Sequence, residues 1–196
     1  MTFPRQLRAA AVLTLLLSAL TGILYPGVVT ALAHLVFPWQ ANGSLVEVGG
    51  RVVGSELIGQ AFTQPWYFHG RPSAAGAGYD GTASGGTNKG PTDSKLAAAI
   101  TERVDSALAQ TGVVRGAVPA DMVTSSASGL DPHISPANAR LQVARVARAR
   151  GADSTAVAAL VERHVEGRQF GLLGEPRVNV LLLNIALDSA IARRNP

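Results

Sequence analysis

The amino-acid sequence predicts an α+β protein with one N-terminal transmembrane helix, followed by a single exported, helix-rich domain with a small β-hairpin or sheet. An unbroken apolar run from 9 to 37 predicts the transmembrane helix. A glycine pair between two β-branched runs predicts the hairpin, and apolar residues recurring every three or four positions after residue 91 predict the helices. We expect a cytoplasmic start and transmembrane helix at 1–37, a membrane-exit linker at 38–44 and an extracytoplasmic soluble domain at 45–196.

The apolar run from 9 to 37 contains no Asp, Glu, Lys or Arg. As a helix rising about 1.5 Å per residue it would extend roughly 43 Å, more than the hydrocarbon core of a bilayer. Arg5 and Arg8 before it, with Ala-Leu-Ala at 31–33, also resemble a cleavable signal peptide, but the apolar core of such a peptide has only about 7 to 15 residues. A buried helix of a soluble protein is rarely apolar on all sides for more than about 20 residues. We therefore predict an uncleaved anchor.

The charges that flank this segment predict its orientation. Arg5 and Arg8 precede it, whereas the first charges after it are Glu47 and Arg51. Because basic residues accumulate on the cytoplasmic side, we expect a single-pass protein of the cell (inner) membrane. Its N-terminus is expected in the cytoplasm and its C-terminal domain outside.

Ser18, Gly22 and Pro26 are the residues of the span that we expect to contact a partner helix. Pro26 has no backbone N–H, and its ring presses on the carbonyl of Gly22, where the missing Cβ leaves room. Ser18 and Gly22 form a pair of small residues four positions apart, which allows close approach of a neighbouring helix. The alternative is an ordinary anchor whose proline faces lipid.

The composition excludes several classes of protein. Seventeen Lys and Arg residues are opposed by thirteen Asp and Glu residues, a balance that does not suggest a nucleic-acid partner. Cysteine is absent, so disulfides, thiolate metal sites and a lipoprotein cysteine are excluded. Beyond the span, the chain is long enough for one soluble domain but too short for a transport machine.

The segments after the span are predicted from local signals. The glycine pair at 49–50 between 45–48 and 51–53 indicates a hairpin, and Ser55 is expected to cap a short helix at 54–58. A glycine-rich loop follows, and its aromatic cluster at 66–69 is expected to be fixed against the domain.

Caps and terminal glycines place the remaining helices. We expect a short extended or turn segment at 118–123, and helices at 92–112, 136–151, 153–167 and from 176 onward. The last apolar run, which contains Val178, Val180 and Leu182, also suits a buried strand, but we favour a helix because the pattern continues past ten residues.

Catalytic and binding motifs give little support for an enzyme. Glycines at 76, 78 and 81 match a dinucleotide fingerprint, but they lie in a predicted loop, and no P-loop is present. Asp131, His133 and Ser135 place an acid, an imidazole and a hydroxyl close together in the sequence. The alternative function is therefore a membrane-anchored exported hydrolase that uses Asp131 and His133. Pro132 and Pro136 instead favour a helix-entry loop in which Asp131 and Ser135 act as caps. A metal site at Asp131 and His133 would need further ligands, and we predict none.

Two further polar features are assigned structural roles. His164 is expected to be a packed core histidine on an apolar helix face. Arg140, Arg145, Arg148 and Arg150 are expected to form a solvated face, with lipid head groups or an acidic partner surface as the alternative.

The chain resembles the KdpC family, the C subunits of bacterial Kdp potassium-transporting P-type ATPases, nearly from end to end. The resemblance rests on seven blocks in order: TGxxYP at 21–26, QANGSL at 40–45, GSELIGQ at 54–60, FxGRPS at 68–73, SGGTN at 84–88, GLDPHIS at 129–135 and GEPRVNV at 174–180.

The resemblance implies a non-catalytic accessory subunit beside a potassium-translocating subunit, an ATP-hydrolysing subunit and a small additional membrane subunit. It also implies a catalytic chaperone that raises the ATP affinity of the hydrolysing subunit. Ser84, Gly85, Gly86 and Asn88 would then contact the nucleotide, although Asn88 stands near where the ABC-transporter signature carries glutamine. The resemblance implies no tightly bound cofactor. It would allow ATP to bind only in a site shared with the hydrolysing subunit. The predicted orientation conflicts with that contact, because it places the domain away from cytoplasmic ATP.

Overall fold

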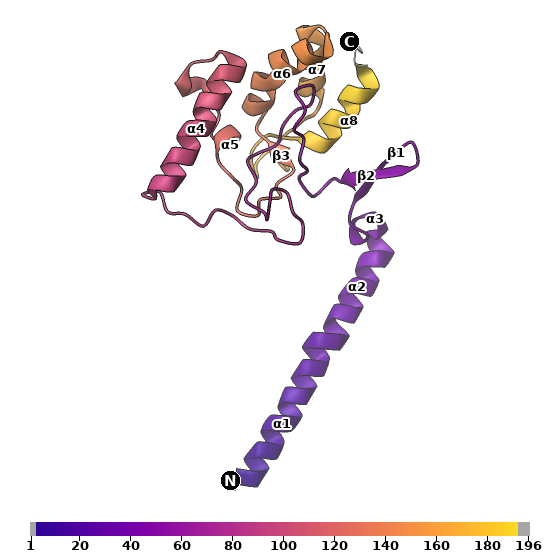
Figure 1. Cartoon of the computed structure of the whole chain (residues 1–196). Helices are drawn as coiled ribbons and strands as arrows, with labels where there is room; N and C mark the ends of the chain where they lie inside the picture. Colours follow the sequence, from indigo (N-terminus) through magenta and orange to yellow (C-terminus); the bar gives the residue numbers. More distant parts are fainter. Residues whose placement is uncertain (1–2, 192–196) are drawn as a thin grey trace. The chain divides into compact units, whose positions relative to one another are not determined.

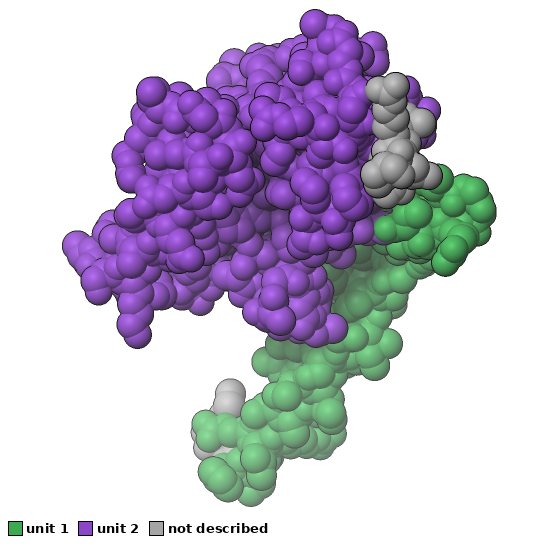
Figure 2. Space-filling view, turned by 45° about the horizontal axis from the view of Figure 1, so that its top comes forward, with its two compact units in different colours: residues 1–53 green, residues 54–196 purple. Residues whose placement is uncertain are grey.

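The computed structural model describes residues 3–191. The chain forms two compact units, residues 1–53 and residues 54–196, which Figure 2 colours separately. The boundary between the two units falls after Val53, so the predicted hairpin at 45–53 belongs to the same unit as the apolar helix.

The first unit begins with a continuous helical segment, Phe3–Val36, of 34 residues. It consists of α1 (Phe3–Ala19), a π-helical turn η1 (Leu20–Leu24) and α2 (Tyr25–Val36), seen as the long helix of Figure 1. No residue of this segment is buried, and it is long and apolar enough to cross a membrane. The predicted N-terminal apolar helix is confirmed.

The π-helical turn lies directly before Pro26. The Tyr25 N–H donates to the carbonyl of Leu20, five positions back, and the Thr21 hydroxyl donates to the Leu17 carbonyl over 2.8 Å. Local π geometry and threonine hydroxyls are two ways in which a membrane helix re-pairs backbone groups next to a proline. The proline is therefore accommodated by a wider turn, in addition to the room at Gly22 that the sequence suggested.

The helix is followed by a short turn of helix and a hairpin. After α3 (Pro38–Ala41), strands β1 (Leu45–Val48) and β2 (Arg51–Ser55) pair with each other. Gly49 and Gly50 have φ angles of 59° and 75°, which a primed two-residue turn requires. The predicted hairpin is confirmed.

The short helix predicted at 54–58 is wrong. Strand β2 continues through Ser55, and a turn follows. The Ser55 hydroxyl accepts the N–H of Leu57 over 3.2 Å, so its bond closes a local turn and does not begin a helix. The Gly59 N–H then donates to the Leu130 carbonyl over 2.7 Å, which directs the chain away from helical pairing.

Helices dominate the second unit. They are α4 (Ser94–Thr111), α5 (Ala120–Val123), α6 (Pro136–Arg150), α7 (Ser154–Arg163) and α8 (Val180–Ala190), with a 3-10 turn η2 (Arg115–Ala117). Asp93, Ser135 and Asp153 accept N–H groups at the first turns of α4, α6 and α7. Helices α4 and α6 end at Gly112 and Gly151, as predicted, and both glycines adopt left-handed geometry. One helical turn, α5, replaces the extended or turn segment expected at 118–123, since Pro119 precedes it and Asp121 lies in its first turn.

A three-stranded antiparallel sheet has the order β3-β5-β4 and is formed by β3 (His133–Ile134), β4 (Val165–Glu166) and β5 (Arg177–Asn179). Ile134 and Val165 both pair with Val178. The last apolar run is therefore a strand before it becomes a helix, and Asn179 ends the strand by accepting the Leu182 N–H at the start of α8.

The same sheet shortens α7. The helix ends at Arg163 and not near residue 167, because Val165 pairs with the central strand. His164 lies at the end of α7, half-buried, with its Nδ1 2.9 Å from the carbonyl of Leu160. The expectation of a packed core histidine is therefore only partly met, because His164 is half-buried and lies just after the last residue of the helix.

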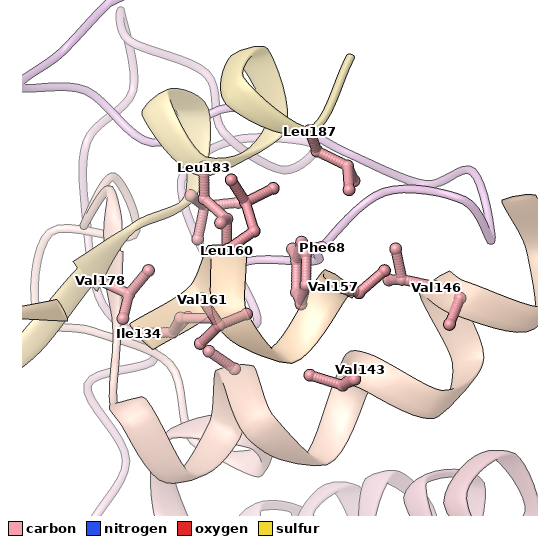
Figure 3. Close-up of a cluster of buried hydrophobic side chains, with 13 residues drawn as sticks. Phe68, Ile134, Val143, Val146, Val157, Leu160, Val161, Val178, Leu183 and Leu187 are labelled. Atoms are coloured by element: carbon pink, nitrogen blue, oxygen red, sulfur yellow. The ribbon is translucent and has the colours of Figure 1, made fainter. Parts of the chain in front are cut away.

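The core of the second unit lies between α6, α7, α8 and β5, and Figure 3 shows Phe68 at its centre. Figure 1 shows that the chain between β2 and α4 contains neither helix nor strand, so Phe68 comes from a loop. Its backbone N–H and carbonyl both bond to the Asn184 side chain over 2.9 Å. The expectation that the aromatic cluster is fixed against the domain is confirmed.

Candidate functional site

The arginines of α6 hold the aromatic segment of the loop in place. Arg150 has a fully buried side chain and donates to the carbonyls of Trp66 (2.9 Å) and Ile191 (2.8 Å) and to the carboxylate of Asp188 (2.7 Å). Its guanidinium also lies 5.3 Å from the centre of the Tyr67 ring. A buried loop must pair its backbone carbonyls, and an arginine fork supplies several donors at one position.

Arg145 has a related role one turn earlier. It donates to the carbonyls of Pro65 (2.6 Å) and Tyr67 (3.0 Å) and to the side chain of Gln142 (2.5 Å). The predicted solvated face is therefore wrong for Arg145 and Arg150, although Arg140 does lie at the surface in an exposed pair with Glu162.

Two buried amides complete this support. The Gln142 side chain accepts the His69 N–H over 2.8 Å and donates to the His69 carbonyl over 3.0 Å, as Asn184 does for Phe68. Neither amide belongs to a motif that the sequence singles out. Their signal was a polar residue at a core-facing position of an amphipathic helix.

Asp131 and His133 form part of a second brace. The Arg71 guanidinium lies 3.1 Å from one carboxylate oxygen of Asp131, and the other oxygen accepts the His133 N–H over 3.0 Å. Arg71 also donates to the carbonyls of Thr124 and Ser125. Burial alone would raise the pKa of Asp131, but hydrogen bonds from His133 and Arg71 outweigh it and lower that pKa.

Ser135 belongs to a different group of side chains. Its hydroxyl donates to Asp121 over 2.8 Å and accepts the Asn138 N–H over 3.1 Å at the start of α6. The residues of the alternative hydrolase are thus used as a turn and a helix cap, and that alternative is not supported. Among residues 3–191, no group of three or more His, Asp or Glu residues could hold a metal ion.

Ser84, Gly85 and Gly86 pack against a neighbouring loop. The Ser84 hydroxyl (3.0 Å) and the Gly85 N–H (2.8 Å) both donate to the carbonyl of Ser128. A Cβ at Gly86 would lie 3.0 Å from the carbonyl oxygen of Ala127, a tight contact that a side chain could make only if the neighbouring loop shifted slightly. Asn88 adopts a left-handed conformation with φ 53°. These contacts explain the local sequence, and the nucleotide contact stays a prediction.

Residues from four segments line a cavity of about 560 Å³, which we call the arginine cavity. The polar side chains among its lining residues include His69, Arg71, Tyr79, Arg103, Gln142 and Arg145. Burial lowers the pKa of Arg145 to about 10. Burial and the nearby charge of Arg145 also lower the pKa of His69, although the bond to Gln64 opposes this.

In the first unit, Ser18, Gly22 and Pro26 are exposed on the apolar helix. A Cβ added to Gly22 would meet no other atom within 4 Å. The surface at this glycine is open to an adjacent helix, and the predicted contact with a partner helix stays a prediction.

Among residues 3–191, one helix is long and apolar enough to cross a membrane, and it leads into an α+β unit, an arrangement typical of a single-pass membrane protein. The family model described as KdpC, K+-transporting ATPase, c chain, matches residues 7–189. The chain therefore belongs to the KdpC family.

Relatives agree with this assignment. The potassium-transporting ATPase KdpC subunit of Gemmatimonas aurantiaca is 65% identical over 96% of this chain and 94% of its own length. The corresponding subunit of Myxococcus xanthus is 58% identical over 95% of this chain and 87% of its own, and that of Nitratidesulfovibrio vulgaris is 57% identical over 95% of each.

Proposed function

We propose that this chain is a non-catalytic accessory subunit of an ATP-driven, high-affinity potassium uptake complex, and that it stabilises the assembly. The observation that carries the proposal is the family match over residues 7–189, with relatives that bear the name of a potassium-transporting ATPase subunit. Its partners are a potassium-translocating subunit, an ATP-hydrolysing subunit and a small additional membrane subunit. The braced loops of the second unit suit a scaffold, because their polar groups hold backbone in place.

The proposed location is the cell membrane, with the N-terminus in the cytoplasm and the second unit outside. Arg5 and Arg8 at the start of the apolar helix support this orientation. A reporter fused after Pro196 tests it: an enzyme active only outside the cytoplasm is expected to be active there. Activity of a cytoplasm-only reporter at that position would overturn the orientation.

The orientation bears on the nucleotide role. With the second unit outside, we propose that any effect on the ATP affinity of the hydrolysing subunit passes through the assembly. Direct contact of Ser84, Gly85, Gly86 and Asn88 with ATP in a shared site is the second candidate, favoured by their resemblance to a nucleotide signature. Ser84→Ala should leave the ATP dependence of the complex unchanged if the effect is indirect, and should raise the ATP concentration for half-maximal activity if the contact is direct.

We propose that the loop between Arg168 and Glu175 is a contact surface for a partner subunit. Phe170, Leu172 and Leu173 in this loop are 88%, 75% and 57% exposed. Arg168 closes its base through two bonds to the Glu175 carboxylate, at 2.9 and 2.8 Å. Removing exposed apolar side chains from water is favourable. The apolar side chains of this loop therefore suit an apolar pocket on a partner subunit.

A protein partner fits this loop better than a lipid surface. Arg168 is paired with Glu175, and Arg177 in the adjoining strand is paired with Glu166 over 2.9 Å. The region therefore offers no excess positive charge to anionic head groups, and the loop contains no Trp or Tyr of the kind that anchors at membrane interfaces.

Co-purification tests the proposed function. When the chain carries an affinity tag and is expressed with the other subunits, both large subunits are expected in the detergent-solubilised eluate. Potassium-stimulated ATPase activity is expected to depend on the presence of this chain. Failure of both subunits to co-purify, or full activity in its absence, would overturn the proposal.

A further inference from the structure

We propose that the arginine cavity binds a small oxyanion of the phosphate or carboxylate class. Three arginines and one histidine line it, and no Asp or Glu of the described residues does so. Arginine supplies planar, paired donors that match phosphate and carboxylate oxygens. A cavity of about 560 Å³ falls within the usual range for small-ligand pockets.

Two of the arginines lack a counter-charge within the described part of the chain. Arg71 is paired with Asp131, but among residues 3–191 no Asp or Glu forms an ion pair with Arg103 or Arg145. Arg145 donates to two backbone carbonyls and one amide, and Arg103 to the Val123 carbonyl over 3.1 Å. These neutral acceptors satisfy individual N–H groups and leave two positive charges beside one cavity.

Burial makes this arrangement favourable for an anion. Arg145 and Arg103 are both half-buried, and burial lowers the pKa of Arg145 to about 10. Removing a cation from water costs free energy unless an opposite charge is near, and a bound oxyanion would supply that charge. The exposed Arg148 on the same helix carries no such cost and does not line the cavity.

The walls of the cavity are held in place before any ligand arrives. Gln142 bonds to both backbone groups of His69. The Tyr79 hydroxyl donates to the carbonyl of Arg71 over 2.5 Å. Arg145 fixes the neighbouring segment through the Pro65 and Tyr67 carbonyls. Preorganised donors reduce the ordering cost of binding, which favours a ligand as small as phosphate.

His69 provides an independent readout of occupancy. Burial, and after it the charge of Arg145, lower the pKa of this histidine. An anion bound between them would favour the protonated ring and raise the pKa of His69. The inference goes beyond the proposed function, because it concerns the chain alone and needs no partner subunit.

The test compares two arginine variants with the same change in net charge. Full-length wild type, Arg103→Gln and Arg148→Gln are purified in detergent, and inorganic phosphate and citrate are titrated by calorimetry. Wild type and Arg148→Gln are expected to bind, and Arg103→Gln to bind at least about tenfold more weakly. Arg103→Lys, which keeps the charge, is expected to recover part of the loss. By NMR, phosphate is expected to raise the pKa of His69 in wild type.

A second arm distinguishes a free anion from the phosphate of a lipid. The three proteins are placed in lipid nanodiscs with or without anionic phosphatidylglycerol. Stabilisation that requires this lipid, persists in Arg148→Gln and is lost in Arg103→Gln supports the site with a lipid phosphate as its ligand. If no anion binds in either arm, or if Arg148→Gln weakens binding as much as Arg103→Gln does, the proposal is overturned.

Discussion

Arg150 shows how one buried cation can organise a loop that has no secondary structure of its own. Its side chain is fully buried and bonds to Trp66, Asp188 and Ile191. In the sequence it is one of several arginines on a helix, and nothing local distinguishes it from the exposed Arg148. What separates them is the loop of residues 64–69, which packs on one side of α6 only. That information is tertiary and could not be obtained from helical spacing.

We predict that Arg150→Met destabilises the second unit by about 3 kcal/mol, since the change leaves buried carbonyls without donors. Arg148→Met, at an exposed position of the same helix, is expected to change stability by less than about 0.5 kcal/mol. Urea unfolding followed by circular dichroism measures both values. Equal effects of the two substitutions would show that burial of the guanidinium is not important.

The lowered pKa of His69 predicts a pH dependence of stability. Burial and the charge of Arg145 disfavour protonation of His69 in the folded state, whereas the unfolded chain protonates it near its ordinary value of 6.5. As pH falls through that value the unfolded state binds more protons, so the stability present above it decreases. Unfolding free energies measured between pH 8 and pH 5.5 should fall, and His69→Gln should reduce the slope. An unchanged slope in the variant would contradict this assignment.

At the scale of elements, features set by local residue types were predicted better than features set by strand pairing. Caps such as Asp93 and Ser135, and the glycine pair at 49–50, carry their geometry in the residue type. The prediction of a helix start at Ser55 was wrong because a serine hydroxyl can close a turn as readily as it caps a helix. The predicted end of α7 was wrong because Val165 pairs with Val178 of β5, and the pattern of apolar residues does not show that pairing.

The loop from Arg168 to Glu175 carries a prediction at this scale. Replacing Phe170 and Leu172 with serine should leave the fold unchanged, because both side chains are exposed. Recovery of the complex should fall by about tenfold, equivalent to about 1.4 kcal/mol of lost contact. Val114→Ser is the control, since Val114 is also an exposed apolar residue, at 76%. Wild-type recovery of the serine variant would remove this loop from the partner surface.

At the scale of the whole molecule, the sequence predicted the architecture and left the candidate site largely unseen. An apolar helix and an α+β unit follow from composition and periodicity. The arginine cavity joins Arg71, Arg103 and Arg145, which lie in a loop and two helices. In the sequence, each of these arginines taken alone is indistinguishable from a solvent-exposed surface residue. Only the tertiary arrangement shows that their charges border one cavity.

The apolar helix carries the last prediction, because the proposed assembly depends on a close helix contact. Gly22→Leu should weaken association with a neighbouring subunit, since the added side chain enters space that is open at this glycine. Gly27 is the matched control: it is helical, equally open, and five positions later on another face of the helix. Recovery of the complex in detergent should fall by about tenfold for Gly22→Leu and remain near wild type for Gly27→Leu. Equal recovery of the two variants would show that the contact lies elsewhere on the helix.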